Sequence, residues 1–162
     1  MDQPAGILIS ELPPDFAQWD ELLALITRAF AYMDGVIDPP SSAHLLTPET
    51  LSEKARRETA FLATENGRIV GCAFAQERKH DFYVGKLAVD PEFQGRGLGG
   101  RLMQAVEELA RRRGRKAIEL QTRIELTGNH AAFARLGFRE TGRTAHDGYD
   151  RPTSITLRKE LS

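Results

Sequence analysis

Hydrophobic and polar positions follow a helical period near the start of this chain. A short apolar run over residues 7–12 predicts a strand, and residues 16–33 then carry apolar side chains at three- and four-residue spacing, which is typical of an amphipathic helix. Asp15 is expected to be the N-cap of that helix. Thr47-Pro48-Glu49 joins a capping hydroxyl, a first-turn proline and an early carboxylate, and so predicts a second, short helix that ends near Arg57.

After these helices the period changes to that of strands. Residues 59–77 hold two β-type runs joined by Asn66-Gly67, the strongest short signal for a hairpin, and residues 81–90 form a third strand-like run. Residues 98–113 return to the helical period, and Gly114 is placed to end that helix.

The last part of the chain alternates between the two periods. Residues 116–122 form a strand of buried character, and residues 129–136 form a short helix that Gly137 ends. Residues 138–146 and 152–161 are expected to be two closing strands around a turn.

The order of these elements predicts the fold class. One strand, two helices, three strands, a helix, a strand, a helix and two strands indicate an α+β fold with a mixed, mostly antiparallel central sheet of about seven strands flanked by about four helices. No linker, repeat or low-complexity tract divides the chain, so residues 1–162 are expected to form a single domain.

Composition narrows the class of partner. With 22 basic and 23 acidic side chains the net charge is −1, so no nucleic-acid or membrane partner is expected. The chain has a single cysteine, Cys72, so an internal disulfide is excluded. Cys72 is expected to be a core residue rather than a nucleophile. Residues 1–10 lack the basic region and apolar run of a signal peptide, which favours a cytoplasmic location.

Glycines gather at the turn between the third strand-like run and the long helix, in the stretch Gln94-Gly95-Arg96-Gly97-Leu98-Gly99. Glycines let a backbone approach a ligand closely, and N–H groups at a helix start point toward an anion. Arg96 adds a positive charge beside them. The stretch therefore predicts a cradle for a pyrophosphate, although a tight turn that binds nothing is the alternative.

The same glycines also match the G-x-G-x-x-G pattern of nicotinamide-binding folds, at Gly95, Gly97 and Gly100, with Glu119 as the acidic residue that follows. In such a fold the glycines come directly after the first strand. Here several strands and a hairpin come first, and residues 91–95 separate the strand from the glycines. A nicotinamide oxidoreductase is therefore disfavoured.

A resemblance to a known family explains the glycines better. The stretch "YVGKLAVDPEFQGRGLGGRLM" resembles the acyl-CoA-binding motif of the GNAT superfamily of N-acetyltransferases, Gln/Arg-x-x-Gly-x-Gly/Ala, filled here by Gln94, Gly97 and Gly99. The element order and a late "LGF" at Leu136-Gly137-Phe138 are similar as well. The resemblance implies acetyl-CoA as co-substrate, held by the backbone of the glycine stretch and of a strand opened by a β-bulge.

The resemblance also implies particular acyl-CoA contacts. The pyrophosphate would lie on the glycine-rich amides, and the pantetheine arm would pair with the exposed strand backbone. The residues so implied are Leu87, Ala88, Val89, Gln94, Gly95, Arg96, Gly97, Leu98, Gly99, Gly100, Asn129 and Phe133.

Residues for the chemistry are less well matched. The family often has a tyrosine, four residues before the glycine of "LGF", that protonates the departing thiolate, and this chain has Phe133 there, with no proton to give. In an alternative alignment Asn129 is the family's helix-start asparagine and nothing matches the tyrosine. Asn129 is then a candidate for a hydrogen bond to pantetheine, for a helix N-cap, or for both. A backbone N–H near Val89 would polarise the thioester carbonyl.

Two tyrosines are candidate catalytic residues. Tyr83 lies upstream on the cleft strand and, by alternation, is expected to share a face with Gly85, Leu87 and Val89, where it could orient a water that acts as base. Tyr149 lies in the turn between the closing strands, from which it could reach the acceptor.

The acceptor would be chosen by the connection between the two N-terminal helices. Tyr32 is expected to form a wall, and Asp34 and Asp38 are expected to attract a cationic amine, unless that loop is simply solvated. The histidines have no partner at ligand spacing, so no metal is expected. The oligomeric state, including a homodimer, stays open.

The expected activity is acetyl transfer from acetyl-CoA to a primary amine of a small molecule or a protein, by direct transfer in a ternary complex. The alternative, prompted by Phe133, is an acyl-CoA-binding module with little or no catalysis.

Overall fold

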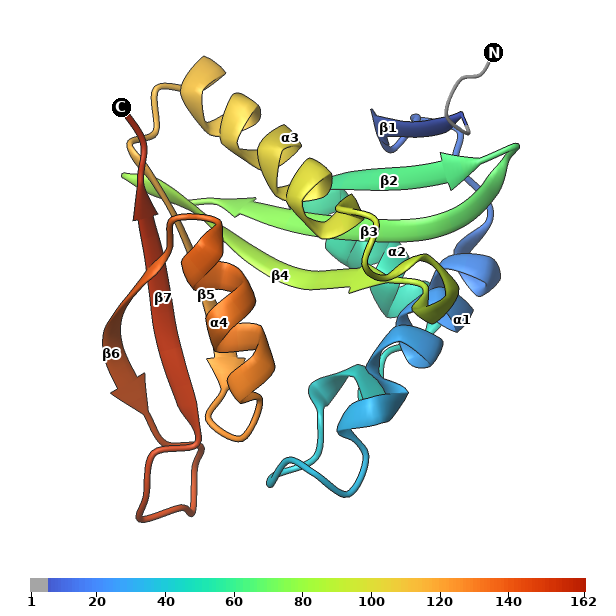
Figure 1. The fold of residues 1–162 in the computed structure, drawn as a ribbon. Helices are drawn as coiled ribbons and strands as arrows, with labels where there is room; N and C mark the ends of the chain where they lie inside the picture. Colours follow the sequence, from blue (N-terminus) through green and yellow to red (C-terminus); the bar gives the residue numbers. More distant parts are fainter. Residues whose placement is uncertain (1–5) are drawn as a thin grey trace.

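The computed structural model describes residues 6–162, which form a seven-stranded sheet with helices on both faces (Figure 1). The strands are β1 (Ile7–Glu11), β2 (Thr59–Glu65), β3 (Arg68–Glu77), β4 (Asp81–Val89), β5 (Ala117–Arg123), β6 (Arg139–Thr144) and β7 (Ser154–Glu160). The α-helices are α1 (Trp19–Phe30), α2 (Pro48–Arg57), α3 (Leu98–Arg112) and α4 (Thr127–Arg135), with 3₁₀ turns η1 (Ala31–Met33), η2 (Ser42–Leu45) and η3 (Pro91–Phe93).

The sheet order is β1-β2-β3-β4-β5-β7-β6. The β4–β5 pair is parallel and the other pairs of the described sheet are antiparallel, so the predicted mixed, mostly antiparallel sheet with four helices is confirmed. At the β2–β3 hairpin, Asn66 and Gly67 have φ of 51° and 82°, as a two-residue turn with both φ positive requires.

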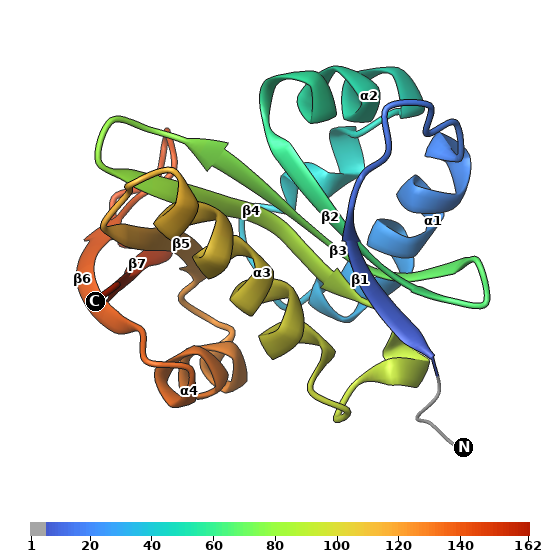
Figure 2. The ribbon, with the colours of Figure 1, turned by 90° about the horizontal axis from the view of Figure 1, so that it is seen from above.

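Two apolar clusters cover the two faces of the sheet. Figure 2 shows α3 on one of these faces and α1 and α2 on the other. One cluster lies under α3 and includes Leu102, Val106 and Ile118. The other lies under α1 and α2 and includes Leu22 and Ile26. The apolar faces of α1 and α3 therefore pack on the sheet, as their amphipathic sequence patterns predict.

Several helix ends differ from prediction. The N-cap of α1 is Gln18, not Asp15, because the chain makes a separate turn first: the Phe16 N–H donates to the Pro13 carbonyl, and the Phe16 and Trp19 rings pack edge-on at 4.8 Å. The α2 start is as predicted, since Thr47 forms a capping box. In the described chain no helix is long and apolar enough to span a bilayer.

Candidate active site

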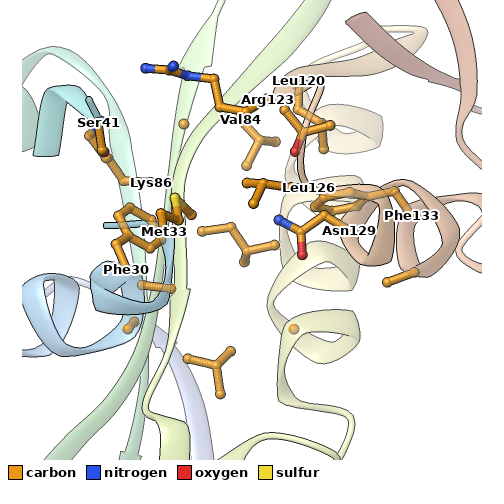
Figure 3. A pocket seen from close by; sticks show the side chains of 18 of the residues that line it. Phe30, Met33, Ser41, Val84, Lys86, Leu120, Arg123, Leu126, Asn129 and Phe133 are labelled. Carbon is orange, nitrogen blue, oxygen red and sulfur yellow. The ribbon is translucent and has the colours of Figure 1, made fainter. Parts of the chain in front are cut away.

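Strands β4 and β5 run together and then part. Their ladder joins Asp81–Val84 to Ala117–Leu120, whereas the later residues of β4 pair only with β3, and those of β5 only with β7. The two facing edges beyond Val84 and Leu120 therefore have unpaired backbone groups, which need a partner when they are covered. Between them lies a cavity of about 970 Å³. In Figure 3, Phe30, Met33, Ser41 and Lys86 lie on one side of it, and Leu126, Asn129 and Phe133 on the other.

A β-bulge lies in β4 where the strands part. Phe74 faces Gly85 but Cys72 faces Ala88, so β4 has one extra residue there, and Lys86 adopts φ of 56°. The bulge implied by the resemblance is therefore present.

The bulge reverses the side-chain alternation that follows it. Leu87 and Val89 join the cluster under α3, whereas a Cβ built on Gly85 would point toward Tyr83 and α2. The expectation that Tyr83 shares a face with Leu87 and Val89 is wrong, because simple alternation assumes an unbroken ladder.

Beyond β4, the chain turns through η3 into the glycine stretch. Asp90 is only 2% exposed and holds this turn: it accepts the Glu92 N–H and pairs with Arg28 and Arg68 at 3.0 and 3.3 Å. Burial opposes ionisation of Asp90, but the Glu92 hydrogen bond and the arginines outweigh it and lower the pKa of its carboxyl.

The glycine stretch leaves amides free at the start of α3. Gly95 and Gly97 have φ of 81° and 78°, in the left-handed region that favours glycine. Arg101 donates the first bond of the helix, to the Gly97 carbonyl, so the preceding amides from Leu98 to Gly100 have no acceptor inside the helix. A Cβ added at Gly99 would meet nothing within 4 Å, so the approach to these amides is open.

Most of the expected acyl-CoA contacts meet around this one cavity. Those that line it are Leu87, Ala88, Val89, Gln94, Gly95, Gly97, Leu98, Gly99, Gly100, Asn129 and Phe133. Arg96 is exposed and does not line it; its guanidinium stacks on the Phe93 ring at 4.8 Å.

Helix α4 forms the far wall. It begins at Thr127 after an N-cap at Leu126, so the N-cap role considered for Asn129 is wrong; the helix starts a half-turn earlier than its apolar period indicates. The Asn129 amide instead donates to the Tyr32 hydroxyl at 3.1 Å. One turn later Phe133 packs edge-on against Phe138, with ring centroids 5.7 Å apart.

The two candidate tyrosines lie in different surroundings. Tyr83 lines the cavity, and burial raises the pKa of its hydroxyl, while Arg78 stacks on its ring at 5.1 Å. Tyr149 does not line the cavity; its hydroxyl donates to Asp38 at 2.6 Å, and this bond is the main cause that raises its pKa.

Residues 34–41, which we name the strap, follow η1 on the α1 side of the cavity (Figure 1). They bond across to the end of β5 and to the β6–β7 turn. Arg123 donates to the Pro39 and Pro40 carbonyls at 2.5 and 3.1 Å, and Asp38 bonds Tyr149 and Arg151. Of the three expected acceptor residues, Tyr32 lines the cavity. Asp34 pairs with His44 at 2.8 Å, and neither Asp34 nor Asp38 is part of the lining.

The acetyltransferase (GNAT) family model matches residues 19–138 of this chain. The chain belongs to the GNAT family of acetyltransferases. The IAA acetyltransferase of Azospirillum brasilense is a relative of this GNAT enzyme, 32% identical over 145 residues that make up 88% of this chain and 92% of the relative.

Other relatives match less of their own length. The [Ribosomal protein bS18]-alanine N-acetyltransferase of Escherichia coli (strain K12) is 29% identical over 89 residues, 55% of this chain, and the chain spans 60% of that relative. The solved paia N-acetyltransferase of Thermoplasma acidophilum, in complex with coenzyme A, has a TM-score of 0.80 at 14% identity, over 96% of this chain and 99% of that one, which shows the shared GNAT fold.

Among the polar residues of this GNAT cavity that sequence reasoning missed are Lys86, Arg123 and His146, which all line it. Lys86 stands in a mostly apolar strand, a signal that could have drawn attention to it, whereas Arg123 follows Gln121 and Thr122 and does not stand out. His146 gave no such signal, because it reaches the cavity only through the β6–β7 turn, where its Nδ1 lies 2.5 Å from the Thr153 hydroxyl.

Proposed function

We propose that this GNAT enzyme transfers an acetyl group from acetyl-CoA directly to a primary amine, with both substrates bound at once. One observation carries the proposal: a single cavity runs from the glycine stretch along the unpaired edge of β4 to the strap. Two substrates that enter from its two ends would meet in line at the bulge, and such positioning supplies much of the acceleration in group transfer.

The lining fits acetyl-CoA. The amides of Gly95 to Gly100 would bind the pyrophosphate at the positive end of α3. The pantetheine amides would pair with the free edge of Leu87 to Val89, and Asn129 lies across from it.

In the reaction, the amine nitrogen forms a bond to the acetyl carbon as the bond from that carbon to sulfur breaks, and coenzyme A leaves as thiolate. A backbone N–H near Val89 would stabilise the charge that develops on the carbonyl oxygen. The amine must first be neutral. Lys86 and Arg123 favour that form, because nearby positive charge lowers the pKa of a bound ammonium.

Direct transfer also agrees with the state of the one cysteine. Cys72 is 0% exposed, and burial raises the pKa of its thiol to about 12, so it is neither reachable nor ionised as an acetyl carrier would be. Two expectations stay predictions: the cytoplasmic location and a single domain over residues 1–162. The second candidate function, an acyl-CoA-binding module, is favoured only by Phe133 in place of a tyrosine.

The first experiment separates these functions. Release of coenzyme A thiol is followed with a panel of small amines and peptide amines, and acetyl-CoA binding is measured by calorimetry. Saturable turnover that survives iodoacetamide treatment, with no acetylated protein seen by mass spectrometry, supports direct transfer. Binding without turnover on any amine supports the module.

A matched pair of glycine substitutions tests the cradle. Gly99 and Gly128 are each the second residue of a helix, and each has open space at its Cβ position, but only Gly99 lines the cavity. Both Gly99→Ala and Gly128→Ala should stabilise the fold by about 0.5–1 kcal/mol. Gly99→Ala alone should weaken acetyl-CoA binding, by roughly tenfold or about 1.4 kcal/mol, because its methyl group blocks the amides. Equal Kd values for the two variants would contradict a cradle at the start of α3.

A further inference from the structure

The lining of the cavity has an unbalanced charge. Among the described residues that line it there is no aspartate or glutamate, whereas Lys86, Arg123 and Arg135 contribute cations. An enzyme that recognised a cationic acceptor by charge would present carboxylates here. The lining instead suits a ligand that brings its own negative charge.

Of these cations, Lys86 has the surroundings that best indicate an anion-binding role. It sits on the bulge, and its Nζ donates to the Ser42 hydroxyl at 2.9 Å. Within the described chain no carboxylate lies within 4.0 Å of it. Burial is the main cause that lowers its pKa, the charges of Lys54 and Arg123 add to the effect, and the charge of Glu58, which pairs with Lys54, opposes it. A half-buried ammonium that bonds no carboxylate is stabilised when an anion binds beside it.

Arg123 lies across the cavity, at the end of β5. It is close enough for its charge to help lower the pKa of Lys86. The hydrogen-bond acceptors of Arg123 are the carbonyls of the strap, which are neutral. Asp38 and Glu125 are close enough to favour its charge, but neither lines the cavity: Asp38 bonds Tyr149 and Arg151, and one Glu125 oxygen accepts the Asp38 N–H.

Lys86 and Arg123 lie away from the glycine stretch. Lys86 lies four residues before Asp90, which is roughly 13 Å along a strand. The strap bonds Arg123 and Tyr149 at this end of the cavity. Phe30, Met33 and Leu126 add apolar surface to the lining here (Figure 3).

We propose that the acceptor is a small amine that also carries a carboxylate, and that Lys86 and Arg123 bind this carboxylate beside the strap. The inference rests on the proposed acetyl transfer and names its substrate class. The carboxylate holds the molecule at the bulge, and the two cations keep its amine in the neutral form that attacks the thioester.

The test compares each acid with its own carboxamide. L-Leucine, L-phenylalanine and γ-aminobutyrate are assayed against leucinamide, phenylalaninamide and γ-aminobutyramide, and kcat/KM is measured for every pair. The α-amino amides are the weaker bases and lose their proton more easily, so chemistry alone favours them. We expect at least one acid to exceed its amide by about 10- to 100-fold, as a charge-assisted contact predicts.

Variants then assign the preference to this cavity. Lys86→Met keeps the length of the side chain and removes its charge, and should bring the acid-to-amide ratio toward one. Lys79→Met, at an exposed turn outside the cavity, should keep the ratio of the native enzyme. Because the ratio is taken within one preparation, partial misfolding does not affect it.

Three results would overturn the inference. Amides that react as well as acids would refute the carboxylate while acetyl transfer stands. A Lys86→Met enzyme with an unchanged ratio but weaker binding of coenzyme A would assign the lysine to a phosphate of the co-substrate. No turnover with any amine, despite acetyl-CoA binding, would refute the proposed function as well.

Discussion

Phe133 stands on the cavity wall one helical turn after Asn129, where many members of the family have a tyrosine. Its edge-on contact with Phe138 holds it by apolar packing. The leaving thiol has a pKa of roughly 8.5, so the thiolate is a fair leaving group that water can protonate afterwards. A proton donor at this position therefore assists the reaction without being indispensable.

Phe133→Tyr should consequently change kcat little, by less than about threefold, because thiolate departure does not limit the rate. The measurement is kcat at saturating acetyl-CoA over a range of pH, with Phe16→Tyr, outside the cavity, as control. A gain beyond roughly tenfold, or about 1.4 kcal/mol of barrier, would show that protonation of the thiolate is limiting.

Single residues also mark where sequence reasoning stopped. The glycines of the loop were predictable, because a motif of fixed spacing reports a backbone shape. The face of Leu87 and Val89 was not, because one extra residue at Lys86 reverses the alternation and no local pattern announces it. The chemistry of the acceptor end depends on that same residue.

At the scale of elements, the strap matters most for function. Its bonds to Arg123, Glu125, Tyr149 and Arg151 join segments that are 83 to 113 residues apart in the chain. Helices and strands were predictable because their periods are local. The strap was not, since its contacts exist only after β5, α4 and the β6–β7 turn have been brought together.

Tyr149→Phe removes the hydroxyl that bonds Asp38 and should loosen the strap. We expect KM for the acceptor to rise about two- to tenfold, the range of a typical lost hydrogen bond, because this pair is exposed. Acetyl-CoA affinity should not change, because the glycine stretch lies at the other end of the cavity. Steady-state kinetics with each substrate varied in turn measure both effects.

The control for the strap is Asp147→Asn, an exposed acid in the same turn. It should leave KM for the acceptor as in the native enzyme. A Tyr149→Phe enzyme that loses kcat with unchanged KM would contradict a closing role and favour Tyr149 as a catalytic group.

At the scale of the whole molecule, the site exists because two halves of the sheet meet over a short ladder. Four charged side chains lie at the closed end of that junction. Asp81, 7% exposed, pairs with Arg78 and Arg158 at 2.7 Å each, and both arginines also pair with Glu119. The four therefore join β4, β5 and β7 where the strands converge, and allow them to part further along.

Asp81→Asn should destabilise the protein by about 1–3 kcal/mol at neutral pH, because it leaves two half-buried arginines with a weaker, neutral acceptor. The hydrogen bond from Arg78 is the main cause that lowers the pKa of Asp81 below its ordinary value. A lowered pKa in the folded state adds stability above the unfolded pKa of about 3.9, and this stability is lost as the pH falls toward the folded pKa. The difference in unfolding free energy between the native enzyme and Asp81→Asn should accordingly narrow below about pH 4.

Urea unfolding at neutral and acid pH measures this difference, and Glu140→Gln is the matched control. Glu140 pairs with Arg143 at 2.6 Å on an exposed edge strand, so its loss should cost less than about 1 kcal/mol. The same variant also tests function. Asp81 does not line the cavity, but Asp81→Asn should raise KM for both substrates together, because the angle at which β4 and β5 part would no longer be fixed. A variant that is destabilised yet keeps both KM values would show that apolar packing under α3 sets the angle by itself.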